Sequence, residues 1–183
     1  MKYLRLYESL SLNHIRKQLP FEIAKGNADL SVRRLLKTED KIDYDVYLPS
    51  KGINLQRPFV WTLEQKQDLI MSVIKDLDIR KITIIRDFSN STIQIIDGKQ
   101  RLSTILSFCN DGFPIDIEGY GEYLFSKLPK DIQNSILSLT IYSDVAYEDK
   151  NYKISDEDKI NWFEKLNYAG TPADKEHLKN LKN

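Results

Sequence analysis

Hydrophobic and polar positions along the chain follow two periods, which together predict a protein with both helices and strands. Apolar residues that recur at three- and four-residue spacing are typical of amphipathic helices. Such helices are expected at 62–77, 99–109, 129–137 and 155–170. Runs of β-branched residues, or strict apolar–polar alternation, predict strands instead. Strands are expected at 46–48, 81–86, 92–96 and 139–147.

The N-terminal part of the chain is predicted to be a mostly helical extension over 1–45. Ile15, Leu19 and Ile23 would share one helical face there. The whole chain of 183 residues is long enough for a substantial core and has no repeats or flexible linker, so one domain over 1–183 is expected. The fold class is therefore α+β, with a small mixed sheet surrounded by helices and more helix than strand.

Charge and cysteine content exclude some of the functions that the chain could otherwise have. Lys plus Arg number 27 and Asp plus Glu also 27, so the formal net charge is zero. This balance argues against avid, purely electrostatic binding to duplex DNA, although a local basic site is compatible with it. Cys109 is the single cysteine, so no internal disulfide and no Cys/His metal site are expected. With no predicted signal peptide or membrane span, a cytoplasmic protein is expected.

A sharp turn between a predicted strand and a predicted helix brings polar groups together. Asp97-Gly98 ends the strand, and Gly98 lets the backbone turn because it has no Cβ. Lys99, Gln100 and Arg101 then occupy the first helical turn, where free N–H groups and the helix dipole favour an anion. We interpret the turn as a phosphate site, with Arg101 and the turn amides binding the phosphate. Asp97 would position a water molecule, a metal ion or a ribose hydroxyl.

The alternative for this turn is structural. Asp-Gly turns before helices are common, so Asp97 would only cap the helix and Arg101 would lie on the surface. The upstream segment 56–61 raises a similar choice. Gln56 and Arg57 precede a proline that favours extended backbone, so Arg57 would reach a second phosphate or form only a surface ion pair. Trp61 is expected in the core, with stacking on a base as the alternative.

The C-terminal third offers fewer candidates. Asn167 lies near the end of a predicted helix, where it would bind the polar edge of a ligand or satisfy loop carbonyls. Thr171 is expected to cap a following helix. His14 and His177 belong to no visible catalytic set, and no glycine-rich P-loop occurs in the sequence.

Three segments carry a resemblance to a known family. Residues 97–102, Asp-Gly-Lys-Gln-Arg-Leu, resemble the Asp-Gly-Gln-Gln-Arg signature of the N-terminal domain of GmrSD-type restriction endonucleases, which have a ParB/sulfiredoxin-like fold. Residues 56–61, Gln-Arg-Pro-Phe-Val-Trp, resemble the upstream Gln-Arg-Pro element of the family. Residues 163–167 with 170–172 resemble its downstream Phe-x-x-Leu-Asn-x-Gly-Gly-Thr-Pro element. The three segments occur in the order typical of the family.

The resemblance implies a nucleoside triphosphate pocket, with Mg²⁺ accompanying the nucleotide. Asp97 and Arg101 are the implied catalytic residues. The implied nucleotide- and phosphate-binding residues are Gln56, Arg57, Gly98, Lys99, Gln100, Arg101 and Asn167. The sequence departs from the family pattern at Lys99, which replaces a glutamine and adds a charge, and at Ala169, which replaces a glycine.

Two functions follow as hypotheses. The first is an NTP-binding and NTP-hydrolysing module of a restriction system that acts on modified DNA with a nuclease supplied by another chain. No His-Asn-His cluster occurs in the sequence, so we do not expect the chain to cut DNA unaided. The second is a non-catalytic DNA- or protein-binding module that modulates such a system. Direct nuclease activity at Asp97 and Arg101 is a third, weaker option, because no carboxylate cluster accompanies them.

Overall fold

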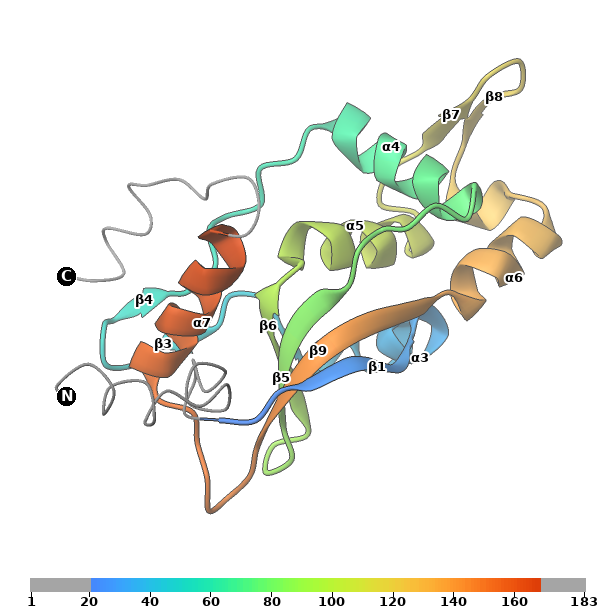
Figure 1. Ribbon diagram of the computed structural model, residues 1–183. Coiled ribbons are helices and arrows are strands. Elements are labelled where there is room, and N and C mark those ends of the chain that lie inside the picture. The colour runs from blue at the N-terminus through green and yellow to red at the C-terminus, as the bar shows by residue number, and fades with distance from the viewer. Residues whose placement is uncertain (1–20, 169–183) are drawn as a thin grey trace, which may run out of the picture.

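A five-stranded mixed sheet forms the centre of the molecule, shown in Figure 1; the computed structural model describes residues 21–168. The strand order is β1-β9-β5-β6-β2. β9 pairs with β5, and β6 with β2, in parallel, whereas the other neighbours are antiparallel. The strands are β1 (Ala24–Ser31), β2 (Ile42–Asp43), β5 (Ile82–Asp87), β6 (Thr92–Asp97) and β9 (Thr140–Glu148). The prediction of a small mixed sheet with surrounding helices is confirmed.

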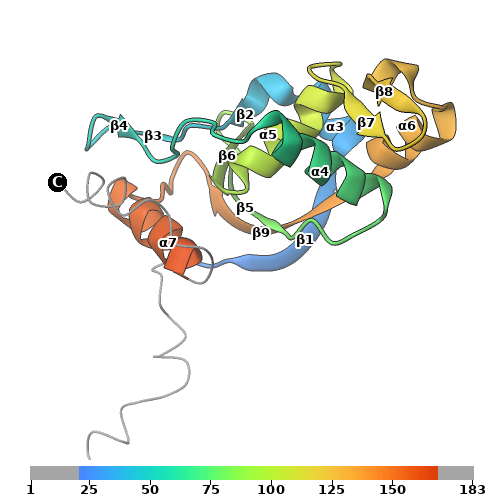
Figure 2. The same ribbon diagram turned by 90° about the horizontal axis from the view of Figure 1, so that it is seen from above.

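Several helices cover one face of this sheet (Figure 2). They are α3 (Val32–Lys37), α4 (Leu63–Ile74), α5 (Lys99–Cys109) and α6 (Lys130–Ser138). Ile84 and Ile95 of the sheet are fully buried against this layer, together with Leu102 and Ile105 of α5. The three- and four-residue spacing in α5 therefore marks the face that packs on the sheet, as the sequence predicts.

The opposite face of the sheet is covered by α7 (Asp156–Tyr168) and by the segment 46–55. Ile85 and Ile96 pack there against Trp162 and Phe163 of α7. Side chains alternate between the two faces along each strand, so β5 and β6 contribute to both cores. Two small hairpins complete the structure: β3 (Tyr47–Leu48) with β4 (Ile53–Asn54), and β7 (Ile115–Ile117) with β8 (Gly121–Tyr123).

Local sequence signals determine where the main helices begin. Thr62 accepts a hydrogen bond from the Gln65 N–H, and the Gln65 side chain accepts one from the Thr62 N–H, which completes a capping box at α4. At α7 the Ser155 hydroxyl accepts a hydrogen bond from the Asp158 N–H. Both starts agree with the predicted ones.

Within residues 21–168, no helix is long and apolar enough to cross a membrane.

The N-terminal prediction is wrong for two elements. Within the described part of the extension expected to be helical, Ala24–Ser31 forms β1, an edge strand antiparallel to β9, and Ile42–Asp43 forms β2, whereas α3 and the 3₁₀ turn at 39–41 are helical. β1 lacks the β-branched residues that signal strands, so its conformation comes from hydrogen bonds to β9 rather than from local preference. His14, Thr171 and His177 lie outside the described residues.

Cys109 is half-buried at the end of α5 and packs against the hydrophobic core between the sheet and the layer of α3, α4, α5 and α6. Burial raises the pKa of its thiol to about 12, and the nearby carboxylate of Glu39 contributes to the rise. The thiol therefore stays protonated near neutral pH, which suits a packing residue rather than a reactive one.

Candidate functional site

The predicted phosphate turn lies where β6 gives way to α5. Gly98 takes a left-handed conformation with φ of +98° at the N-cap of α5. A Cβ at this position would come within 2.4 Å of the Ile82 Cγ2 on the neighbouring strand. Glycine is therefore required both by the backbone angle and by the close approach of β5. The Asp-Gly turn is in place, but the α5 N-cap receives no side-chain hydrogen bond, so Asp97 does not cap the helix.

All of the residues predicted to act on nucleotide line one cavity of about 190 Å³, here called the cup. They are Gln56, Arg57, Asp97, Gly98, Lys99, Gln100, Arg101 and Asn167. Trp61 and Phe163 complete the lining. The described parts of the three segments that resemble the family signature, 56–61, 97–102 and 163–167, thus converge on one place, although they come from a loop, the β6–α5 turn and α7.

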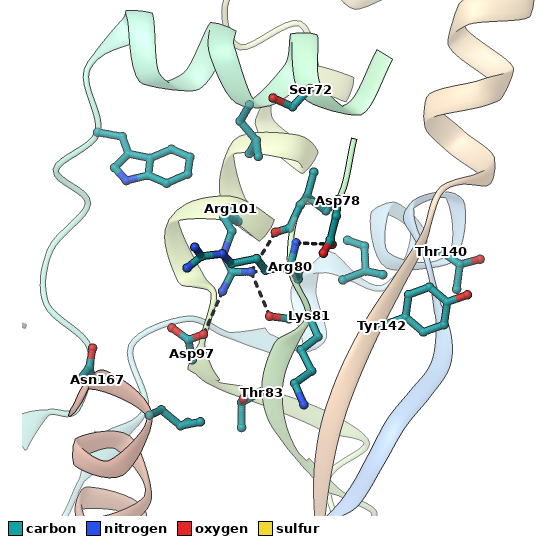
Figure 3. A pocket seen from close by; sticks show the side chains of 15 residues that line it. Ser72, Asp78, Arg80, Lys81, Thr83, Asp97, Arg101, Thr140, Tyr142 and Asn167 are labelled. Atoms are coloured by element: carbon teal, nitrogen blue, oxygen red, sulfur yellow. Dashed lines mark hydrogen bonds and ion pairs between the residues drawn. The ribbon is translucent and has the colours of Figure 1, made fainter. Parts of the chain in front are cut away.

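A larger cleft of about 940 Å³ adjoins the cup (Figure 3). The two cavities share Trp61, Asp97, Arg101 and Asn167 as lining residues. Trp61 is only half-buried and lies in neither hydrophobic core, so the expectation of a core tryptophan is wrong. Its side chain instead faces both cavities.

Arg101 is bound on most sides by the protein itself, as Figure 3 shows. Its Nη1 donates to the carbonyl oxygens of Ile79, Arg80 and Lys81 at 3.0, 2.9 and 2.9 Å. Its Nη2 donates to the Asp97 Oδ2 at 2.8 Å. The side chain is only 18% exposed, so the alternative of a surface arginine does not hold. Nη1 has two hydrogens for three acceptors, and one of the two Nη2 hydrogens goes to Asp97, so these contacts use most of the donors of the guanidinium.

The three carbonyls that meet Arg101 belong to the turn before β5. Arg80 has a left-handed φ of +61°, and its N–H donates to the Asp78 Oδ1 at 2.8 Å. This turn aims consecutive carbonyls toward one point, where the guanidinium joins it to α5. Arg101 therefore shapes the wall between cup and cleft. No pattern in the sequence signals this interaction, because its acceptors are backbone atoms.

Lys99 and Gln100 hold the upstream loop in a similar way. Gln100 accepts hydrogen bonds from the N–H groups of Val60 and Trp61, at 3.0 and 3.3 Å, and donates to the Pro58 carbonyl. Lys99 donates to the Asp45 carboxylate at 2.5 Å and to the Arg57 carbonyl at 3.0 Å. The side chain of Lys99 is 11% exposed, so the charge added by this departure from the family pattern is paired inside the site.

Gln56 and Asn167 also make internal hydrogen bonds. The Gln56 side chain is buried, and its Nε2 donates to the carbonyls of Ile95 and Ile96 at 2.8 and 2.7 Å. Asn167 donates from Nδ2 to the Phe163 carbonyl one turn earlier in α7. Gln56 therefore joins the upstream loop to the end of β6, and Asn167 binds its own helix rather than loop carbonyls.

Arg57 differs from the other cations of the cup. It is exposed, and its guanidinium forms no hydrogen bond or ion pair with the residues at 21–168. Lys99 and Arg101, by contrast, are both engaged by backbone carbonyls and carboxylates. Among the described residues, no group of three or more His, Cys, Asp or Glu side chains is placed to bind a metal ion on its own.

This geometry agrees with a sequence comparison over most of the chain. The family profile described as GmrSD restriction endonuclease, N-terminal domain, matches residues 33–182. The chain belongs to this family. The match includes all three segments that line the cup, so the resemblance on which the site was predicted is confirmed. Membership of this family places the GmrSD-type domain in the context of a restriction system. No curated protein and no solved structure matches the chain.

Proposed function

We propose that this GmrSD-type domain binds a nucleoside triphosphate, with the phosphates in the cup and the nucleoside directed into the adjoining cleft. The convergence of Arg57, the β6–α5 turn and Asn167 on one small cavity is the observation that supports this function most directly. A cup of about 190 Å³ beside a cleft of about 940 Å³ is large enough for both parts of a nucleotide.

The phosphate contacts would come from Arg57 and from the start of α5. The first N–H groups of a helix have no intrahelical partner, and the residues at the start of α5 line the cup. Arg57 is the cation of the cup with a guanidinium not engaged by the described residues, so it would supply the ion pair. Lys99 and Arg101 would add positive potential while keeping the loops in place.

Mg²⁺ would enter with the nucleotide. The ion usually takes one or two protein carboxylates together with phosphate oxygens and water, and Asp97, whose side chain is 43% exposed, is the carboxylate in the cup. Bound there, Mg²⁺ would neutralise phosphate charge. Hydrolysis would then depend on positioning and charge stabilisation by the turn amides and these cations. The domain would signal to a nuclease on another chain that acts on modified DNA.

Isothermal titration calorimetry with ATP, GTP, CTP and UTP, each with Mg²⁺, tests the binding step. We expect a signal with at least one of them, and a loss of about tenfold or more in affinity for Arg57→Gln without a change in melting temperature. Arg33→Gln, a matched change on α3 outside the cup, should bind normally. Absence of heat with all four nucleotides would contradict the proposal.

Arg101 requires a separate test because it has two roles. Arg101→Gln removes hydrogen bonds to the turn at 79–81 as well as positive potential, so both nucleotide affinity and melting temperature should fall. A variant that lost affinity but kept the wild-type melting temperature would assign Arg101 to the ligand rather than to the scaffold.

A non-catalytic binding module is the second candidate, and one observation favours it. Asp97 and Arg101, the two residues assigned to catalysis, are bound to each other at 2.8 Å. Release of inorganic phosphate from the nucleotide that binds best separates the candidates. Turnover that disappears in Asp97→Asn supports hydrolysis, whereas binding without turnover supports a DNA- or protein-binding module that modulates a restriction system.

A further inference from the structure

A second cleft, of about 360 Å³, lies at the opposite end of the sheet from the cup. It is formed by α3 and the 3₁₀ turn η1 (Glu39–Lys41) on one side and by the hairpin that joins β5 and β6 on the other. Figure 1 shows this hairpin at the far end of β6 from the start of α5. The six residues of β6 separate the two sites by about 17 Å. We call this cavity the hairpin cleft.

Three of the side chains that line the hairpin cleft carry a positive charge, although the chain has no net charge. Arg34, Lys41 and Arg86 line it together with one carboxylate, that of Asp87. Asp87 is 4% exposed and already accepts a hydrogen bond from Lys153 at 2.5 Å. Its charge is therefore compensated from outside the cleft. The Nζ of Lys41 lies 3.7 Å from the Oδ2 of Asp40. Both side chains are well exposed, and such surface ion pairs are weak.

The remaining lining suits a flat apolar group. Leu30, Leu35 and Ile93 supply apolar lining, and the aromatic side chain of Phe88 lines the cleft as well. Phe88 stacks on Tyr147 with ring centroids 5.5 Å apart and ring planes 6° apart, yet it stays 63% exposed. A large aromatic side chain held parallel to a neighbour but open to solvent is a platform on which a base can stack.

We propose that the hairpin cleft binds single-stranded nucleic acid, with a backbone phosphate near Arg34, Lys41 and Arg86 and a base stacked on Phe88. Cations that follow the backbone and an exposed aromatic ring beside them are the two elements of sequence-tolerant strand binding. The volume of about 360 Å³ admits one nucleotide unit, so the rest of the strand would run over the surface. This site is separate from the cup and does not depend on nucleotide binding there.

Fluorescence anisotropy with a short fluorescein-labelled oligothymidine at low ionic strength tests the assignment. Phe88→Ser should weaken binding about fivefold or more, because the base loses its stacking partner. Tyr120→Ser, which removes another exposed ring from the β7–β8 hairpin, should bind as the wild type does. The double variant Arg34→Gln, Lys41→Gln should lower affinity and reduce the salt dependence by about 0.7 in log–log slope for each phosphate that is no longer neutralised.

Charge-matched controls make the result decisive. Arg33→Gln, Lys37→Gln removes the same charge from the same region without touching the cleft, so its affinity should stay unchanged. Equal losses in the two double variants would overturn the proposal, as would no binding by the wild type. Preference for a duplex of the same sequence, or full competition by free thymidine monophosphate, would also overturn it. Arg57→Gln should leave strand binding intact, since loss there would move the strand to the cup.

Discussion

At the residue scale, Gly98 and Arg101 have physically different requirements although they are only three positions apart. Gly98 is needed because any Cβ would collide with Ile82 and because the backbone is left-handed. Arg101 is needed because one guanidinium meets three carbonyls and a carboxylate. The sequence predicts the turn from Asp97-Gly98, but the carbonyl acceptors of Arg101 lie about twenty residues earlier and are not visible in any local pattern.

Replacing Gly98 by alanine should destabilise the domain more than backbone strain alone explains. We expect Gly98→Ala to lower the free energy of unfolding by roughly 2–4 kcal/mol, since strain and the clash with Ile82 both act. Gly119→Ala is the matched control, because Gly119 also has a positive φ, of +82°, but no atom lies within 4 Å of its added Cβ. Its cost should be about 1 kcal/mol. Equal costs in chemical denaturation would show that Ile82 moves aside freely.

At the element scale, α5 organises the site through its first turn. Lys99 and Gln100 connect this helix to the loop at 57–61, and Arg101 connects it to the turn at 79–81. The motif that resembles the family's nucleotide-binding signature therefore also holds neighbouring segments of the backbone in place. The helices were predictable because their apolar spacing and their caps at Thr62 and Ser155 are local. β1 was not, because its partner β9 is more than a hundred residues away.

Removing the Gln100 side chain should loosen the loop at 58–61 without unfolding α5. In Gln100→Ala, the amide N–H groups of Val60 and Trp61 lose their acceptor, so they should exchange with deuterium faster than in the wild type. Ser103→Ala is the control on the same helix, since Ser103 only donates to carbonyls of α5 itself. Unchanged exchange at Val60 and Trp61 would show that packing, not Gln100, holds the loop.

At the scale of the whole molecule, a buried ion network holds α7 against the far end of the sheet. Glu148 of β9 is 2% exposed and accepts from Lys159 at 3.1 Å and from the Ile154 N–H at 3.1 Å. Asp87 of β5 accepts from Lys153. Since α7 also contributes Phe163 and Asn167 to the cup, this network connects the helix that carries 163–167 to the sheet.

The network makes stability depend on acid pH. Burial raises the pKa of Asp87, but hydrogen bonds from Lys153 and from Ser89 outweigh burial and lower the pKa to about 2. A carboxyl group whose pKa is lowered by folding stabilises the fold at pH values above the ordinary carboxyl pKa. This stabilisation is lost as the pH falls toward the lowered pKa. We expect the free energy of unfolding to drop between about pH 5 and pH 2, with Asp87 contributing about 1 kcal/mol because Lys153 is half exposed.

Asp87→Asn provides the comparison for this pH dependence. The variant should be less stable at pH 7 and should lose less stability than the wild type as the solution is acidified, when both are followed by chemical denaturation. Identical slopes for the two proteins between about pH 5 and pH 2 would assign the acid sensitivity to other carboxylates.

Local features of the sequence were enough to predict the main helices, the strands β5, β6 and β9, the turn at Gly98 and, apart from Trp61 and Phe163, the residues that line the cup, because each depends on periodicity, a cap or a contiguous motif. How those residues are used depends on packing between distant segments. Packing turned Arg101, Lys99 and Gln56 toward backbone and carboxylate partners and left Arg57 exposed in the cup. It also made β1 a strand and brought the cations of the hairpin cleft together, because such contacts exist only once the whole chain has folded.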